Sequence, residues 1–267
     1  MSFPFTKKVV WITGASSGIG EHLAYRIARD QPYLVLSGRR TEALEFVAAQ
    51  TNLPEGHILI LPLDLSKPET FAEAAKKVIE CYGRIDYLVN NSGIGHKSGV
   101  LETSDAVDRK VMEVNFFGNI RLTKTVLPYM LEQGAGQITV ISSMLSKFGA
   151  PDVATYAASK HALNGWYESL RVELYDQNIA IQVIAPGFIK TDVTVKSLDG
   201  EGKPYGQNSP AQEKGMDPKK CAIKIKKIMK SKKPFAYVGG WELGSIPFKT
   251  IAPRMFFWAM RALSRNS

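Results

Sequence analysis

Cysteine and long apolar runs are both scarce in this chain of 267 residues. Cys81 and Cys221 are too few for a disulfide framework or a cysteine-rich metal site, so no metal is expected. We expect both to be small buried apolar residues in a reducing compartment. No window approaches the roughly 20 apolar residues of a membrane span, and the N-terminus lacks a signal-peptide pattern. These absences predict a soluble, cytoplasmic protein.

Acidic residues are missing from residues 219–233, which hold eight lysines. The formal net charge of +9 is therefore mostly local, and the charges elsewhere nearly cancel. This argues against a distributed basic face for nucleic acid. Ile225, Ile228 and Met229 recur at helical spacing, which favours a solvated helix whose lysines extend over its edges. An anionic membrane surface or an acidic partner is the alternative.

Short apolar runs alternate with longer periodic stretches along most of the chain. The runs that predict strands are residues 8–13, 33–37, 58–63, 86–89, 137–142 and 180–185, and 234–238 can add a last one. The stretches that predict helices are residues 21–30, 41–50, 68–82, 105–132 and 153–177. Such alternation indicates βαβ units, and continuously apolar strands indicate a sheet covered on both faces. The sequence predicts one doubly wound α/β domain over residues 1–267.

Two segments break this rhythm. Residues 190–215 are polar and rich in Gly, Ser and Pro, which is typical of a functional loop or lid over a substrate. Residues 244–267 form an extension that is aromatic and basic. Its aromatics could pack on the core or on a partner subunit, or could form an amphipathic helix at a membrane surface. The side chains concerned are Ile246, Phe248, Met255, Phe256, Phe257 and Trp258, with Arg254, Arg261 and Arg265.

A glycine-rich turn, TGASSGIG, follows the first predicted strand and opens the first predicted helix. Gly14, Gly18 and Gly20 permit close backbone approach, and a helix N-terminus offers free N–H groups and the positive end of a dipole. Both features suit a pyrophosphate. The spacing differs from the common G-x-G-x-x-G fingerprint, so a plain tight turn is the alternative, but its place in the first βα unit favours a dinucleotide.

Cations and no acid follow the second predicted strand, in Ser37-Gly38-Arg39-Arg40. A carboxylate at this place would bind a ribose 2′-hydroxyl, whereas the planar fork of arginine can hold a 2′-phosphate. Arg39 and Arg40 therefore favour NADP(H) over NAD(H). The alternative is that both arginines are merely solvated at the start of a helix.

Tyr156 and Lys160 lie four residues apart in a predicted helix and so share a face. A free tyrosine has a pKa of about 10, and a nearby ammonium favours the phenolate. Taken alone, this would be a chance pair on a helix surface. However, Ser143 ends the fifth predicted strand, at the edge where doubly wound sheets bind ligands. A tyrosine that moves one proton and a serine that stabilises charge on oxygen suit hydride transfer to a carbonyl.

Ordered motifs run along almost the whole chain: TGASSGIG at 13–20, NNSG at 90–93, Asn115, ISS at 141–143, YAASK at 156–160 and PGFIKT at 186–191. With these motifs the chain resembles the short-chain dehydrogenase/reductase family. The resemblance implies a single Rossmann-type domain with a seven-stranded parallel sheet flanked by helices, assembled as a homodimer or homotetramer. Two positions depart from the family pattern. Ser92 replaces the usual alanine, and Ser17 replaces a cation that NADP-using members often carry, which leaves Arg39 and Arg40 for the 2′-phosphate.

The resemblance also implies roles for individual residues. Tyr156 would exchange a proton with the substrate oxygen, and Ser143 would hold that oxygen. Lys160 would lower the pKa of Tyr156 and bind the nicotinamide ribose, while Asn115 would fix a water that relays protons to Lys160. Asp64 would lie near the adenine, with Ile189 and Thr191 near the carboxamide. The implied cofactor contacts are Gly14, Ser16, Ser17, Gly18, Ile19, Gly20, Arg39, Arg40, Asp64, Leu65, Asn91, Ser92, Gly93, Tyr156, Lys160, Pro186, Gly187, Ile189 and Thr191.

These patterns together predict an NADP(H)-dependent oxidoreductase that interconverts a ketone or aldehyde and a secondary or primary alcohol. The aromatic extension suggests an apolar small-molecule substrate such as a lipid, retinoid or steroid-like ketone, and it resembles the tails of members that act at membranes. Peripheral membrane contact is therefore a further expectation. The alternatives are an NAD-dependent alcohol dehydrogenase and a non-catalytic dinucleotide-binding sensor, although a sensor need not keep Ser143, Tyr156, Lys160 and Asn115 together.

Overall fold

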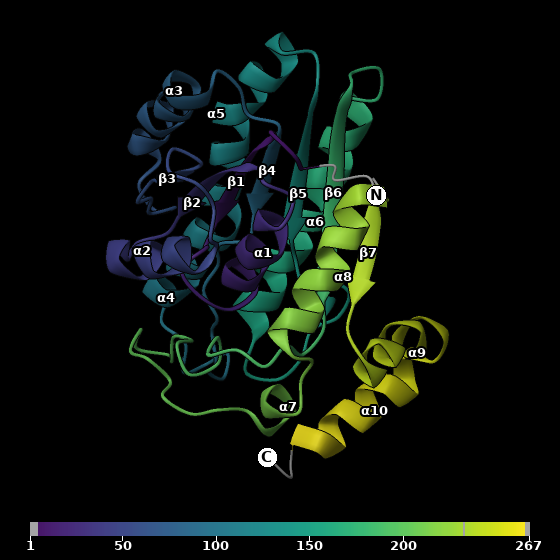
Figure 1. Ribbon diagram of the computed structural model, residues 1–267. Helices are drawn as coiled ribbons and strands as arrows, with labels where there is room; N and C mark the ends of the chain where they lie inside the picture. Colours follow the sequence, from purple (N-terminus) through teal and green to yellow (C-terminus); the bar gives the residue numbers. More distant parts are fainter. Residues whose placement is uncertain (1–4, 232, 265–267) are drawn as a thin grey trace.

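One parallel sheet organises the protein (Figure 1). The structure is a computed structural model that describes residues 5–231 and 233–264. Within them the strands are β1 (Val9–Thr13), β2 (Tyr33–Ser37), β3 (Ile58–Ile60), β4 (Tyr87–Asn90), β5 (Gly136–Ile141), β6 (Ile179–Pro186) and β7 (Phe235–Val238). Their order is β3-β2-β1-β4-β5-β6-β7, so the winding reverses between β1 and β4. The predicted seven-stranded Rossmann-type fold is confirmed.

Helices cover both faces of this sheet (Figure 1). On one face lie α1 (Gly18–Ala28), α2 (Thr41–Gln50) and α8 (Pro218–Ser231). On the other lie α3 (Phe71–Tyr82), α5 (Gly118–Glu132) and α6 (Ala154–Glu173). Because successive side chains of a strand point to opposite faces, β1 sends Val10 and Ile12 into one core and Val9 and Trp11 into the other. Burying each large apolar side chain contributes about 1.5–3 kcal/mol to the stability of the folded chain.

The remaining elements connect or extend these layers. The predicted helix over residues 105–132 is present as α4 (Asp105–Met112), a π turn (Glu113–Phe117) and α5. Single 3-10 turns span Pro68–Thr70, Met144–Ser146 and Trp241–Gly244. The predicted loop contains only α7 (Pro210–Glu213), and the extension forms α9 (Ser245–Ile251) and α10 (Pro253–Ser264), which project beyond β7 in Figure 1.

Two expectations about single residues are wrong. Cys221 is buried as predicted, but Cys81 is exposed, because it lies in the last turn of α3 where Tyr82 takes the inward place. Lys226 does not belong to the solvated face of α8, because its Nζ lies 2.6 Å from a carboxylate oxygen of buried Asp30. Lys232 and Arg265 lie outside the described residues, as does the end of the predicted extension.

No helix in the described ranges is both long and apolar enough to cross a bilayer.

Candidate active site

The carboxyl ends of four neighbouring strands bring the predicted site residues to one edge of the sheet. Gly14 follows β1 directly, Asn91 follows β4, and Gly187 follows β6. Ser143 lies two residues beyond the end of β5. Because β1 and β4 flank the point where the winding reverses, this edge is where doubly wound sheets bind ligands.

The turn between β1 and α1 has room only for glycine at its critical positions. Gly14 and Gly18 adopt φ angles of +63° and +61°, which side chains with a Cβ rarely accept. A Cβ on Gly20 would lie 2.3 Å from the carbonyl oxygen of Gly14 and 2.6 Å from Nδ2 of Asn91. Asn91 itself donates from Nδ2 to the carbonyls of Thr13 and Gly14, at 3.0 and 3.2 Å. The turn is therefore held in an open cradle by Asn91, the residue that follows β4.

The cradle fits a dinucleotide phosphate. Ser17 occupies the N-cap of α1, yet its side chain makes no capping hydrogen bond, so the first-turn N–H groups remain available to an anion. Arg40 is exposed and donates to the carbonyl of Ser16 at 3.4 Å, which places its guanidinium beside the same turn. Thr191 closes the other side, because its Cγ2 would lie 3.2 Å from a Cβ on Gly18.

Ser143, Tyr156 and Lys160 meet where β5 ends and α6 begins. The hydroxyl of Ser143 lies close enough to that of Tyr156 to favour the tyrosine phenolate. The Nζ of Lys160 lies 5.6 Å from the centre of the Tyr156 ring and donates to the carbonyl of Ile141 at 3.2 Å. Ser143 also accepts from the backbone N–H of Leu145 at 3.2 Å, which fixes its rotamer at the start of a 3-10 turn.

Burial dominates the electrostatics of this trio. Burial raises the pKa of Tyr156 above its ordinary value, and the nearby Ser143 hydroxyl offsets only part of that rise. Burial also lowers the pKa of Lys160 to about 8. The net direction for Tyr156 in the chain alone is thus opposite to the one expected from the charge of Lys160. Near neutral pH, Tyr156 is a protonated donor and Lys160 is still mostly cationic.

Asn115 lies fully buried at the centre of the π turn. Its Oδ1 accepts from the N–H of Ile94 at 2.7 Å and its Nδ2 donates to the carbonyl of the same residue at 2.9 Å. A Cβ on Gly93 would lie 3.1 Å from Asn115 Oδ1 and 3.6 Å from Lys160 Nζ, so Gly93 lies between the two side chains. Widened π turns often mark functional positions. The proton relay through a water stays a prediction.

The predicted adenine side is more open. Asp64 follows β3 and accepts from the backbone N–H and the hydroxyl of Ser66 at 3.0 and 2.8 Å. Partial burial works against its ionisation, but these bonds and nearby Arg39 hold the pKa of Asp64 below its usual value. Leu65 is buried, and its carbonyl would lie 2.4 Å from a Cβ on Gly118 at the start of α5. Within the described part of the chain, neither Arg39 nor Arg40 donates a side-chain hydrogen bond to a carboxylate.

Residues 190–215 are not loose, although no periodicity predicted structure there. Leu198 pairs with the segment after β4: its N–H donates to the carbonyl of Gly95 at 3.0 Å, and its carbonyl accepts from Lys97 at 2.8 Å. The N–H of Ser104 donates to Gly200 at 3.0 Å. These backbone bonds hold the predicted lid against residues 95–104.

The C-terminal tail packs against the segment that follows Ser143. Phe256 is buried against Phe148, with ring centres 5.1 Å apart, and Met144 joins this small core directly after Ser143. Beside it, a groove of about 610 Å³ runs along the first turns of α6. Its lining is mostly apolar: Gly149, Ala150, Pro151, Ala154, Ala157, Ala158, Phe257, Met260 and Arg261.

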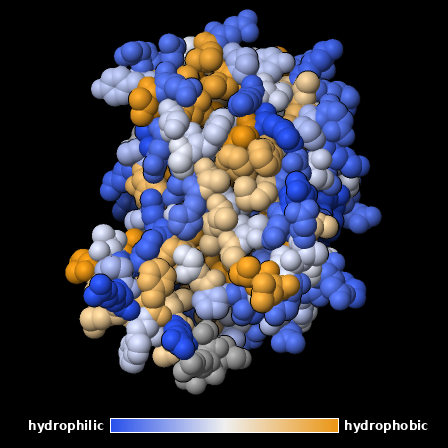
Figure 2. Space-filling view, turned by 180° about the vertical axis from the view of Figure 1, so that it is seen from behind, coloured by the Kyte–Doolittle hydropathy of each residue, from blue (hydrophilic) through white to orange (hydrophobic). Residues whose placement is uncertain are grey.

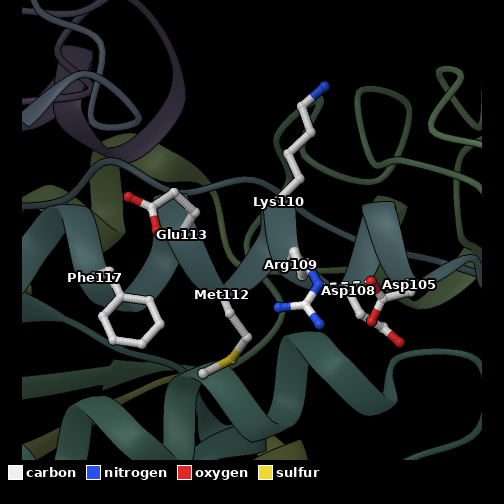
Figure 3. Close-up of a pocket in the computed structure, with 7 residues that line it drawn as sticks. All are labelled: Asp105, Asp108, Arg109, Lys110, Met112, Glu113 and Phe117. Carbon is white, nitrogen blue, oxygen red and sulfur yellow. Dashed lines mark hydrogen bonds and ion pairs between the residues drawn. The ribbon is translucent and has the colours of Figure 1, made fainter.

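A second hollow of about 660 Å³ lies elsewhere, and like the groove its lining contains none of the four predicted catalytic residues. Figure 3 shows that its side chains project from one helical stretch, α4 and the π turn, with an ion pair between Arg109 and Asp105. Because one helix supplies all of them, no set of groups converges from several elements as it does around Ser143.

Sequence reasoning missed one buried group at this edge, Glu242. It accepts from the N–H groups of Phe188 and Gly240, and a Cβ on Gly187 would lie 2.1 Å from its Oε1. A signal existed, because Glu242 is the one acidic residue after Asp217. An isolated acid in a basic, aromatic segment indicates a specific partner for its carboxylate.

Comparisons with known proteins show the family of the chain. A family model described as short chain dehydrogenase matches residues 8–202. The chain is similar to the dehydrogenase/reductase SDR family protein 7-like of Drosophila melanogaster, with 38% identity over 95% of this chain and 79% of that protein. It is also similar to the human dehydrogenase/reductase SDR family member 7, with 41% identity over 87% of this chain and 73% of that protein.

Solved structures show the same likeness. Levodione reductase superimposes with a TM-score of 0.80 and 28% identity, over 90% of this chain and 99% of that one. An alcohol dehydrogenase from Thermococcus sibiricus, complexed with 5-hydroxy-NADP, superimposes with a TM-score of 0.74 and 29% identity, over 88% and 97% of the two chains.

Proposed function

Because the chain belongs to the short-chain dehydrogenase family and is an oxidoreductase that acts on CH–OH groups with a nicotinamide dinucleotide, we propose that Ser143, Tyr156 and Lys160 carry its chemistry. The reaction would interconvert a ketone or aldehyde and the corresponding secondary or primary alcohol. The observation that carries the proposal is that Ser143, Tyr156 and Lys160 meet where β5 ends and α6 begins, with the Lys160 Nζ 5.6 Å from the centre of the Tyr156 ring.

In the direction of reduction, the Tyr156 hydroxyl donates its proton to the substrate oxygen. The Ser143 hydroxyl donates a hydrogen bond to the same oxygen and stabilises the charge that develops there. The Lys160 ammonium then stabilises the phenolate left on Tyr156, and Asn115 would position the water that returns a proton. The dinucleotide, when bound, supplies the hydride in reduction and accepts it in oxidation.

NADP(H) is the proposed cofactor. Arg39 and Arg40 follow β2 with no acid between the strand and α2, and the guanidinium of Arg40 lies beside Ser16 in the phosphate turn. Two arginines and no carboxylate favour a 2′-phosphate over a 2′-hydroxyl. The similar alcohol dehydrogenase from Thermococcus sibiricus is complexed with an NADP derivative, which supports the same choice. NAD(H) use is the alternative.

An apolar substrate is proposed because the groove along the first turns of α6 has a mostly apolar lining. Tyr156 belongs to the same turns of α6 but is not part of that lining. Residues 190–215 would close over the substrate as a lid, since backbone bonds already hold them near the end of β4. We expect self-association as a homodimer or homotetramer through large apolar side chains that α5, α6, the turn after α6 and the π turn leave exposed, namely Phe117, Leu131, Val172 and Tyr175.

Peripheral contact with a membrane is proposed for the tail helices. Trp241, Ile251 and Trp258 are 89%, 82% and 75% exposed, which is unusual for such large apolar side chains. Figure 2 shows apolar and hydrophilic side chains interspersed over these helices, at the lower left. Cationic Arg254 and Arg261 accompany them, a combination that suits an anionic lipid interface.

A panel of apolar ketones and aldehydes, scored by the loss of NADPH absorbance, tests the proposed function. We expect turnover of at least one member, and we expect Tyr156→Phe to lower kcat by about 10²–10⁴-fold while NADPH still binds. NADPH binding without turnover of any carbonyl or alcohol would favour the non-catalytic sensor. Substantial turnover by Tyr156→Phe would remove the proposed mechanism.

A further inference from the structure

A buried carboxylate joins the start of the tail to the turn that follows β6. Glu242 lies in the 3-10 turn Trp241–Gly244 and is only 6% exposed. Its Oε1 accepts two backbone hydrogen bonds, from Gly240 at 2.9 Å and from Phe188 at 3.2 Å. The first bond is local, whereas the second crosses from the tail to a segment more than fifty residues earlier.

The Glu242 carboxylate packs so closely against Gly187 and Gly239 that neither glycine could carry a side chain. A Cβ on Gly187 would lie 2.1 Å from its Oε1, and a Cβ on Gly239 would lie 2.6 Å from the same atom. Glu242 therefore occupies the volume that two glycines leave free. Among the hydrogen bonds and ion pairs of the described residues, none joins its carboxylate to a lysine or arginine, so backbone N–H groups hold it. Losing a buried acceptor of this kind leaves its donors without partners.

The segment that Glu242 holds leads straight into the site. The N–H of Gly187 donates to the carbonyl of Val238, and the carbonyl of Phe188 accepts from Met216, so the turn is clamped on both sides. Thr191, three residues beyond Phe188, lies against Gly18 of the glycine cradle. A shift of Phe188 would therefore be transmitted to the wall of the dinucleotide site.

The residues that follow Glu242 contact the segment after Ser143. Leu243 and Ile246 pack against the small core of Met144, Phe148 and Phe256, which follows Ser143 directly. The Nζ of Lys249 donates to the carbonyl of Lys147 at 2.7 Å. One short stretch of the tail thus contacts both the segment after Ser143 and the turn that leads to Thr191.

We propose that Glu242 is a positioning residue of this enzyme, which holds the 186–191 turn so that the reacting end of the dinucleotide faces Tyr156. The proposal rests on the proposed function for its kinetic consequence. The glycine cradle and the arginines are untouched by Glu242, so they would still bind the phosphates when it is removed. The loss should therefore appear in kcat more than in dinucleotide affinity, because misplacement of reacting groups by about 1 Å can cost about 10²-fold.

Glu242→Ala, Glu242→Gln and Thr250→Ala are the variants that test this. Thr250 is exposed in the same tail and its hydroxyl donates to the carbonyl of Ile246 within α9, so Thr250→Ala is the matched control. We expect Glu242→Ala to lower kcat about 10–100-fold, with little change in the NADPH dissociation constant. Glu242→Gln keeps an oxygen acceptor and should restore most of kcat. Rates are normalised to NADPH-binding sites, so that a misfolded fraction does not count.

Hydrogen exchange of the 186–191 segment, measured without cofactor, provides a readout that needs no turnover. Exchange at Phe188 should rise in Glu242→Ala and stay low in Glu242→Gln and Thr250→Ala. Unchanged exchange in Glu242→Ala, or a wild-type kcat in that variant, overturns the proposal while the proposed function stands. Absence of turnover in the wild-type chain overturns the kinetic role together with the proposed function, whereas the exchange result still decides whether Glu242 holds the turn.

Discussion

The carboxyl edge of the sheet and the C-terminal tail present side chains in opposite ways. At the edge, Asn115, Lys160 and Ser143 are 0%, 4% and 8% exposed, and each is held by a hydrogen bond to a backbone group: the first two across segments, Ser143 within its own turn. On the tail, Trp241 and Trp258 are largely exposed and contribute little to any core. The fold itself therefore orients the proposed reacting groups, whereas the tail leaves large apolar side chains on the surface.

Gly20→Ala should have the largest effect on the edge. The new Cβ would lie 2.3 Å from a backbone oxygen, so the cradle must shift, and overpacking of this kind costs about 1–3 kcal/mol. If that cost falls on the binding conformation, NADPH affinity drops about 10–100-fold. Fluorescence titration measures it. Gly165→Ala in α6 is the control, because a Cβ there meets nothing within 4 Å and affinity should not change.

Removing the two arginines should separate the cofactors. In Arg39→Ala/Arg40→Ala we expect NADPH affinity to fall about tenfold or more, because hydrogen bonds to charged groups are worth about 1.5–3 kcal/mol. NADH affinity should hardly change, since it carries no 2′-phosphate. Competition binding with both dinucleotides measures the ratio. Equal losses for the two would remove the argument for NADP(H).

The pH profile of carbonyl reduction tests the electrostatics of the edge. The pKa of Lys160 is lowered to about 8 and that of Tyr156 is raised, so Tyr156 keeps its proton while Lys160 loses its charge as the pH rises. We expect kcat/KM, which reports the free enzyme, to be level below pH 8 and to fall above it. In Lys160→Met the rate should be low throughout and lack this descent. A wild-type profile that rises through pH 8 contradicts the assignment.

Substitutions of exposed side chains in the tail should have the smallest effect on the stability of the chain. Trp241→Ala/Trp258→Ala removes two exposed side chains, so the free energy of unfolding should change by less than about 0.5 kcal/mol. Co-sedimentation with anionic vesicles should nevertheless decrease. Phe256→Ala is the contrast within α10, because that side chain is buried and its loss should cost about 3 kcal/mol. If the wild-type chain does not bind vesicles at all, the membrane proposal is abandoned.

The fold could be predicted closely because periodicity is a local signal. Every strand and long helix expected from the sequence is present, although boundaries differ: the strand expected over 58–63 ends at Ile60, and the helix expected to reach residue 177 ends at Glu173. Ser143, Tyr156 and Lys160 were expected together, and the structure brings them together.

What could not be predicted depends on contacts between distant segments. The pairing of Lys226 with Asp30 spans nearly two hundred residues, and the bond from Phe188 to Glu242 spans more than fifty. The docking of Leu198 on the segment after β4 is of the same kind. No local pattern encodes such pairs, because they form only when the sheet places the two segments side by side.

Deuterium transfer tests whether this chain moves hydride to a carbonyl with Tyr156 as the proton donor. NADPH deuterated at the transferable position of its nicotinamide is incubated with the chain and the best carbonyl of the panel, and the alcohol is analysed by mass spectrometry. The account predicts that the wild-type chain places deuterium on the carbinol carbon, and that Tyr156→Phe binds the same cofactor but forms almost no labelled alcohol. Labelled alcohol at the wild-type rate from Tyr156→Phe, or alcohol without label from the wild-type chain, would contradict it.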